Sequence, residues 1–178
     1  MAIELILGGA RSGKSAYAER LARDSGMAVS VVVTAVAHDD EMAARIRMHR
    51  TQRPAGWRTV EAPLDLAAAL RDEARAGRFV VVDCLTLWAA NHLCPPDADD
   101  HVPESWDAAR DALLDALPTL PGSIALVANE IGWGVVPLGA ATRRFVDEAG
   151  RLNQALARRC DTVTLVAAGL PLRLKGAP

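Results

Sequence analysis

The chain has 178 residues, of which 51% are apolar, and its formal net charge is −2. The length suits one domain with a substantial core, and this composition excludes both a disordered chain and a strongly basic nucleic-acid-binding protein. The sequence shows neither an apolar run of ~20 residues that would cross a membrane nor a basic-then-apolar signal segment. We therefore expect a cytoplasmic protein with one domain over residues 1–178, without a membrane span or a nucleic-acid partner.

Short β-rich runs alternate with helical patterns along the chain. In chain order, strands are expected over residues 3–7, 29–34, 57–61, 79–83, 124–128 and 162–167, the last of which would close the sheet. The intervening helices are expected over residues 16–22, 41–49, 64–76, 85–93, 104–117 and 140–159. Gly26 would end the first helix and Asp39 or Asp40 would cap the second, while residues 95–100 form the most loop-like stretch. Because helices between buried strands require crossover connections, the pattern predicts an α/β fold with a mainly parallel sheet and helices on both faces.

A glycine-rich segment after the first predicted strand matches the pattern G-x-x-x-x-G-K-[ST]. Between a strand and a helix, this pattern is typical of a P-loop, whose glycines let the backbone curl around an anion with its N–H groups pointing inward. Lys14 would reach the β- and γ-phosphates, and Ser15 would offer its hydroxyl to Mg²⁺. The sequence therefore predicts a nucleoside triphosphate site made by Gly8, Gly9, Ala10, Arg11, Ser12, Gly13, Lys14 and Ser15.

Polar residues also follow three other predicted strands. A sheet of this class places its ligand at the carboxyl ends of the strands, so these residues are candidates for the site. Thr34 would meet a phosphate or ribose, or serve only as a turn former. Asp83 follows four apolar residues, as a Walker-B aspartate that orients Mg²⁺ does. Asn129 and Glu130 precede a glycine-rich turn, and either a substrate-binding role or a simple turn fits them.

His49 is the remaining chemical signal. On a helix, Arg45, His49 and Arg53 fall at i, i+4 and i+8 and therefore lie on one strip. A histidine on a basic helix face is usually a solvated surface residue. Next to a bound nucleotide, however, its imidazole would be able to attack an α-phosphate while Arg50 and Arg53 hold the phosphates or the departing pyrophosphate. On these residues alone, both interpretations remain open.

Together these motifs resemble the bifunctional adenosylcobinamide kinase/adenosylcobinamide-phosphate guanylyltransferases of cobalamin biosynthesis. The matching segments follow the family order over nearly the whole chain, at residues 8–15, 40–46, 49 with 53–54, 57–59 with 61, 83–88, 129–137 and 150–154. A generic P-loop enzyme would share only the first of them. The resemblance implies a RecA-like P-loop NTPase fold, a homotrimer, and two activities in one polypeptide.

The resemblance also implies the chemistry. The kinase reaction would move the γ-phosphate of ATP or GTP to a hydroxyl of adenosylcobinamide, with Lys14 and Mg²⁺ assisting. In the second reaction, His49 would attack the α-phosphate of GTP and pass the guanylyl group to adenosylcobinamide phosphate, giving adenosyl-GDP-cobinamide and pyrophosphate. Some members have two adjacent histidines where this chain has Met48 and His49, so only His49 can be the nucleophile here. The residues implied to bind the nucleotide are those of the P-loop and Thr34, Ala35, Arg50, Thr51, Gln52, Arg53, Glu61 and Asp83. Ser15 and Asp83 are also implied to bind the metal.

Two other functions compete with this one. A single-activity P-loop kinase for another small metabolite would leave His49 as an incidental surface residue. A regulatory GTP-binding switch would need a D-x-x-G motif at a strand exit, but the match at residues 147–150 lies inside a helical pattern, and no N-K-x-D segment is present.

Overall fold

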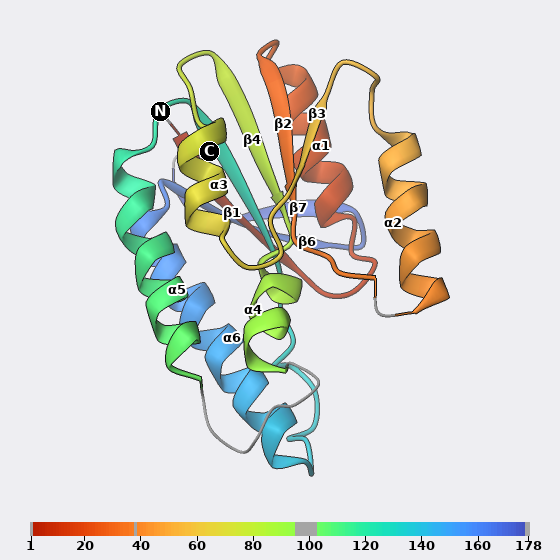
Figure 1. Ribbon diagram of the computed structural model, residues 1–178, viewed down its shortest axis with the longest axis vertical. Helices are drawn as coiled ribbons and strands as arrows, with labels where there is room; N and C mark the ends of the chain where they lie inside the picture. Colours follow the sequence, from red (N-terminus) through yellow and green to blue (C-terminus); the bar gives the residue numbers. More distant parts are fainter. Residues whose placement is uncertain (1, 38, 95–102, 177–178) are drawn as a thin grey trace.

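The computed structural model describes residues 2–37, 39–94 and 103–176 (Figure 1), and within its helices the side chains at positions 45, 49, 50, 52 and 104 lie outside the description. The loop expected over residues 95–100 also lies outside the described residues. The strands are β1 (Ala2–Gly8), β2 (Ala28–Val33), β3 (Arg58–Glu61), β4 (Arg78–Asp83), β5 (Ser123–Asn129), β6 (Thr162–Ala167) and β7 (Leu170–Lys175). The helices are α1 (Lys14–Asp24), α2 (Asp40–Gln52), α3 (Leu66–Glu73), α4 (Leu85–Leu93), α5 (Glu104–Ala116) and α6 (Ala140–Arg159), with the 3₁₀ helix η1 (Leu117–Thr119).

Within this part of the chain, the strands form one seven-stranded sheet in the order β3-β2-β4-β5-β1-β6-β7. Every neighbouring pair is parallel except β6 and β7, which are antiparallel. The predicted α/β class, with a mainly parallel sheet, is therefore confirmed. The chain begins in the middle of the sheet, since β1 lies between β5 and β6.

The sheet separates two apolar layers because successive side chains of a strand point to opposite faces. On β1, Leu5 and Leu7 belong to the larger cluster, which packs against α3, α4, α5 and α6, whereas Ile6 belongs to the smaller cluster with Tyr17 and Ala18 of α1. The two faces are thus covered by helices as predicted. Figure 1 shows α2 standing apart from the other helices, and none of its described side chains is fully buried.

Two expectations about the elements were wrong. The helix expected over residues 64–76 is shorter, because the chain is already extended at Ala74 and turns through Gly77 (φ 78°) into β4. The strand β6 does not close the sheet, because Ala168 (φ 51°) and Gly169 (φ 79°) form a tight turn that returns the chain as β7. Two consecutive residues with positive φ are the usual geometry of a two-residue hairpin.

Glu73 links α3 to three strands. Its carboxylate accepts hydrogen bonds from the Ser30 hydroxyl at 2.7 Å, Arg58 Nε at 3.0 Å and Arg78 Nη1 at 3.0 Å. Burial raises the pKa of Glu73, but the Ser30 hydrogen bond and the two arginines outweigh it, so the net pKa is lowered. A lowered folded-state pKa means that ionised Glu73 stabilises the fold above the ordinary glutamate pKa, and that this stabilisation disappears as the pH falls through the folded value.

Glu73→Gln is therefore expected to lower the free energy of unfolding at pH 7 by about 2–3 kcal/mol, because the buried Ser30 hydroxyl and the two arginines would face a neutral amide instead of a carboxylate. Urea titration at pH 7 and again at pH 3.5 would measure the effect, which should shrink at the lower pH. Asp72→Asn, at the exposed neighbouring position, is the matched control and should change stability by less than about 0.5 kcal/mol. An equal loss at both pH values would contradict the role of the ionised carboxylate.

Candidate active site

The P-loop is held between neighbours on both sides of β1. On one side, the Glu130 backbone N–H donates to the Gly8 carbonyl at 3.1 Å. On the other side, the Gly169 N–H in the β6–β7 turn donates to the Ser12 carbonyl at 2.8 Å. Gly13, with φ 96°, precedes α1 and provides no side chain to cap it. The N–H groups of the first helical turn are therefore open to an anion, as in other phosphate-binding helices.

The first glycine of the loop has no room for a side chain. A Cβ on Gly8 would lie 2.4 Å from Ser12 Oγ and 2.5 Å from the Val166 carbonyl oxygen, whereas a Cβ on Gly9 would meet nothing within 4 Å. Gly8→Ala is therefore expected to destabilise the fold by about 1–3 kcal/mol and to weaken nucleotide binding, because the loop must shift. Thermal unfolding and GTP titration calorimetry would measure both effects.

Gly9→Ala is the matched control, since it adds the same methyl group one residue later, in open space. It should leave the unfolding temperature nearly unchanged. If both variants lost the same stability, crowding at Gly8 would not be the cause.

Lys14 is the buried cation of the loop. Its side chain folds back so that Nζ donates to the Gly9 carbonyl at 3.1 Å, and the residue is only 9% exposed. Burial lowers the pKa of Lys14, while the nearby Cys84 and Asp83 act in the opposite direction. A triphosphate placed on the loop would supply the anionic partner that this buried ammonium needs.

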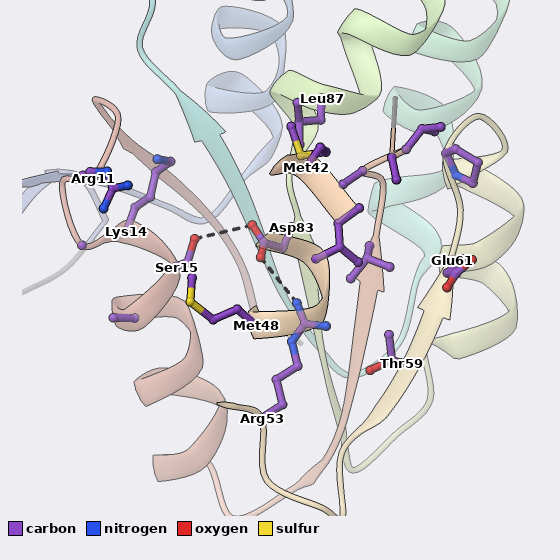
Figure 2. A pocket seen from close by; sticks show the side chains of 18 of the residues that line it. Arg11, Lys14, Ser15, Met42, Met48, Arg53, Thr59, Glu61, Asp83 and Leu87 are labelled. Atoms are coloured by element: carbon purple, nitrogen blue, oxygen red, sulfur yellow. Dashed lines mark hydrogen bonds and ion pairs between the residues drawn. The ribbon is translucent and has the colours of Figure 1, made fainter. Parts of the chain in front are cut away.

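Asp83 lies opposite the P-loop at the end of β4, between two polar partners (Figure 2). Ser15 Oγ is 3.5 Å from Asp83 Oδ1, and Arg53 Nη2 is 3.6 Å from Asp83 Oδ2. The Arg53 side chain is 6% exposed, and its Nε has no hydrogen-bond partner among the described residues. The guanidinium therefore retains a buried donor that an incoming phosphate would satisfy.

The donors around Ser15 and Asp83 suit Mg²⁺. A hydroxyl and a carboxylate converge from facing elements, as Mg²⁺ sites on nucleotides require, with phosphate oxygens and water completing the shell. Among the described residues, no cluster of three or more His, Cys, Asp or Glu side chains offers a cage made by the protein alone. A metal held jointly with the nucleotide fits these residues.

The P-loop, the ends of β2 and β4, and α2 enclose a cavity of about 850 Å³. This volume lies in the range of small-molecule and cofactor sites. Its phosphate-binding side carries Lys14, Ser15 and Asp83, while Met42 and Met48 bring apolar side chains from α2. The cavity therefore combines charged groups, which suit phosphates, with apolar side chains, which suit an organic group.

Most of the predicted site residues meet at this cavity. Those that line it are Arg11, Ser12, Gly13, Lys14, Ser15, Ala35, Arg53, Glu61 and Asp83. Gly8, Gly9 and Ala10 form the start of the loop and are not among the lining residues, and Thr51 is exposed, with its hydroxyl donating to the Met48 carbonyl at 2.9 Å. His49, Arg50 and Gln52 belong to α2, but their side chains lie outside the described part of the structure.

Thr34 and Arg53 are placed differently from the expectation. Thr34 is 0% exposed, and its hydroxyl donates to the Cys84 carbonyl at 2.7 Å and accepts from the Cys84 N–H at 3.1 Å. Its side chain therefore joins two loops and does not face the cavity, which its neighbour Ala35 does line. Arg53 does not continue the helical strip, because α2 ends at Gln52 and Arg53 is extended (φ −75°, ψ 145°).

Two contributions to the site escaped the sequence reasoning. The apolar wall from Met42, Ile46 and Met48 was missed because these residues had been assigned only to a helix pattern. Met42 and Ile46 lie at i and i+4 on one side of the helix, but Met48 lies off that side, so no regular apolar stripe marked this wall in the sequence. Asn153 of α6 was also missed, although it donates to the Glu130 carboxylate at 3.2 Å, because no local pattern links residues so far apart in the sequence.

The sequence profile described as "Cobinamide kinase / cobinamide phosphate guanyltransferase" matches residues 4–174. The chain belongs to this family. Within it, the chain is 60% identical over 175 residues to the "Bifunctional adenosylcobalamin biosynthesis protein CobP" of Pseudomonas aeruginosa, which covers 98% of each protein. It is also 39% identical over 180 residues to the CobU protein of the same description from Escherichia coli, covering 96% of this chain and 98% of that protein.

Membership of the cobinamide kinase/guanyltransferase family makes this chain a bifunctional enzyme of adenosylcobalamin biosynthesis. Among solved structures, the RadB recombinase superposes with a TM-score of 0.51 and 15% sequence identity, covering 92% of this chain and 73% of RadB. At this identity the likeness concerns the fold alone, and it confirms the expected RecA-like P-loop architecture. A bilayer-spanning helix is not found in the part of this family member that the structure describes.

Proposed function

We propose that this enzyme phosphorylates adenosylcobinamide with ATP or GTP, and then transfers GMP from GTP, through His49, to adenosylcobinamide phosphate. Both reactions would use one nucleotide cavity in one domain over residues 1–178. The observation that carries the proposal is the convergence of Lys14, Ser15 and Asp83 on a cavity of about 850 Å³ that is walled by α2, the helix to which His49 belongs.

In the kinase reaction, the protein mainly positions and neutralises the phosphates. The N–H groups at the start of α1 and the Lys14 ammonium would hold the β- and γ-phosphates, with Arg53 adding a guanidinium from the opposite wall. Ser15 and Asp83 would hold Mg²⁺, which when bound offsets the negative charge of the phosphates. The acceptor hydroxyl forms the new O–P bond while the bond between the γ-phosphorus and the β,γ-bridging oxygen breaks.

In the guanylyl transfer, the His49 imidazole would form an N–P bond to the α-phosphorus of GTP as the bond to pyrophosphate breaks. An oxygen of adenosylcobinamide phosphate would then attack the same phosphorus and release the imidazole. Histidine suits this double displacement because its neutral form is accessible near pH 7. Arg50, Thr51, Gln52, Arg53 and Glu61 would contact the guanine nucleotide, and Ala35 would lie against it through its backbone.

We also propose that the enzyme is a homotrimer. The outer strand β7 exposes Leu170 (72%), Leu172 (58%) and Leu174 (56%) at alternate positions. An edge strand with a row of exposed leucines is a surface that proteins normally cover. Sedimentation equilibrium would test the assembly, and a monomer at micromolar concentration would contradict it.

The proposed function is tested by following both products from one protein sample. The enzyme with Mg²⁺ and γ-labelled ATP should transfer label to adenosylcobinamide. With α-labelled GTP and no corrinoid, the protein itself should carry label that is labile to acid and stable to alkali, as a phosphohistidine bond is. Label on the corrinoid without label on the protein would refute the covalent half and favour a single-activity kinase.

A further inference from the structure

The exit of β5 brings a carboxylate next to the P-loop. Asn129 pairs in register with Gly8 of β1, and the next residue, Glu130, donates its N–H to the Gly8 carbonyl at 3.1 Å. Glu130 therefore follows the strand that lies between the P-loop strand and the Asp83 strand. None of the residues proposed above to bind the nucleotide or the metal comes from this strand.

The side chain of Glu130 is held in place by α6. Asn153, only 8% exposed, donates its Nδ2 to Glu130 Oε1 at 3.2 Å and to the Asn129 carbonyl at 3.4 Å. From α4, Thr86 accepts the Asn129 N–H at 2.7 Å. Helices α4 and α6 thus hold the end of β5 in place. A catalytic side chain needs support of this kind to keep its position.

Two oxygen atoms at the end of β5 accept no hydrogen bond from the described residues. Among the described residues, Glu130 Oε2 makes no hydrogen bond or ion pair, and the buried Oδ1 of Asn129 has no partner. Both atoms accept hydrogen bonds and neither donates. A triphosphate also presents only acceptors and negative charge, so it is a poor match, whereas a hydroxyl donor is a good one.

A second cavity begins beside this strand exit. It has a volume of about 320 Å³ and its lining starts one residue after Glu130, at Ile131, while Glu130 itself lines neither this cavity nor the nucleotide cavity. The second cavity is lined by residues 131–132 and 134–137 of the loop after β5, and by Arg143, Val146 and Asp147 of α6. In this loop Trp133 is 74% exposed and Val135 is 95% exposed, which leaves apolar surface beside the opening. A large acceptor would be able to rest there with its hydroxyl directed at Glu130.

We propose that Glu130 is the general base of the kinase reaction and that the second cavity receives the acceptor arm; this rests on the function proposed above. Glu130 Oε2 takes the hydroxyl proton, the alkoxide oxygen bonds to the γ-phosphorus, and the nucleoside diphosphate leaves with the bridging-oxygen electron pair. The proton is then released to solvent. A carboxylate that accepts the substrate hydroxyl proton is the usual arrangement in kinases.

The test is Glu130→Gln, which keeps the size of the side chain and its bond from Asn153 but removes the base. The kcat for phosphorylation of adenosylcobinamide by ATP should fall roughly 10²–10³-fold. The Kd for GTP, measured by calorimetry, should stay within about twofold because Glu130 is not among the residues that line the nucleotide cavity. Asp72→Asn, an exposed carboxylate of α3, is the control and should leave both values unchanged.

The outcomes separate this inference from the function on which it rests. If the unaltered enzyme moved no label from ATP to adenosylcobinamide, the proposed kinase function itself would fail. If the unaltered enzyme were active and folded Glu130→Gln kept more than a third of its kcat, the general-base role would be overturned. Glu130→Asp restores a carboxylate and should regain at least tenfold over the glutamine variant; activity equal to that variant would also overturn the role.

Discussion

Lys14→Ala is expected to reduce both reactions roughly 10²–10³-fold, because each needs the same ammonium to neutralise charge on the phosphates of the nucleotide. Lys14 is 9% exposed and its Nζ lies against the Gly9 carbonyl, so the substitution removes the ammonium from the inside of the loop. Kinase and guanylyl-transfer rates measured on the same preparation should fall together. The Kd for GTP should rise as well.

Lys175, the other lysine of the chain, provides the control. Its Nζ donates to carbonyls at the end of α6, at 2.9 Å from Ala157 and 2.6 Å from Cys160. Lys175→Ala should therefore cost about 1 kcal/mol of stability without affecting either rate. If Lys14→Ala lost one activity and kept the other, the two reactions would not share the P-loop, and the single-cavity proposal would be wrong.

His49→Ala is expected to separate the two activities. Removal of a nucleophile should lower guanylyl transfer on the order of 10⁴-fold or more, because no second histidine adjoins His49 in the sequence. Phosphorylation of adenosylcobinamide should stay within about threefold, since it proceeds by direct transfer. The measurement is label from α-labelled GTP retained on the denatured protein, together with a kinase assay on the same sample.

His92→Ala is the matched control for this experiment. His92 belongs to α4, stacks edge-on to Trp88 with ring centroids 5.3 Å apart, and does not line the nucleotide cavity. It should leave both rates within about twofold. Acid-labile label that persisted on His49→Ala would show that another group is the nucleophile.

The local features of the site were predictable because each of them depends on consecutive residues. The P-loop lies between β1 and α1, and Asp83 ends β4, as their flanking apolar runs and glycines predicted. The helices over Leu85–Leu93 and Ala140–Arg159 have the predicted bounds. In each case one short window contains the apolar pattern and its terminating signal.

The features that were missed depend on partners distant in sequence. The Thr34 hydroxyl binds the backbone of Cys84, 50 residues later, so its burial could not be seen from its position at a strand end. Asn153 reaches Glu130 from 23 residues away. The strand β7 is a different case, because its leucines alternate with Pro171, Arg173 and Lys175 between two glycines, and that period-two pattern was available in the sequence.

The central position of β1 has a consequence for how the enzyme is made. The P-loop precedes in the sequence both neighbours of β1, which are β5 and β6, and the Gly169 N–H that supports Ser12 comes later still. Domains fold as units once their long-range contacts are available, so a nascent chain that ends before Gly169 lacks one of the two backbone supports of the loop. The P-loop is thus completed only after residues far downstream of it have been synthesised.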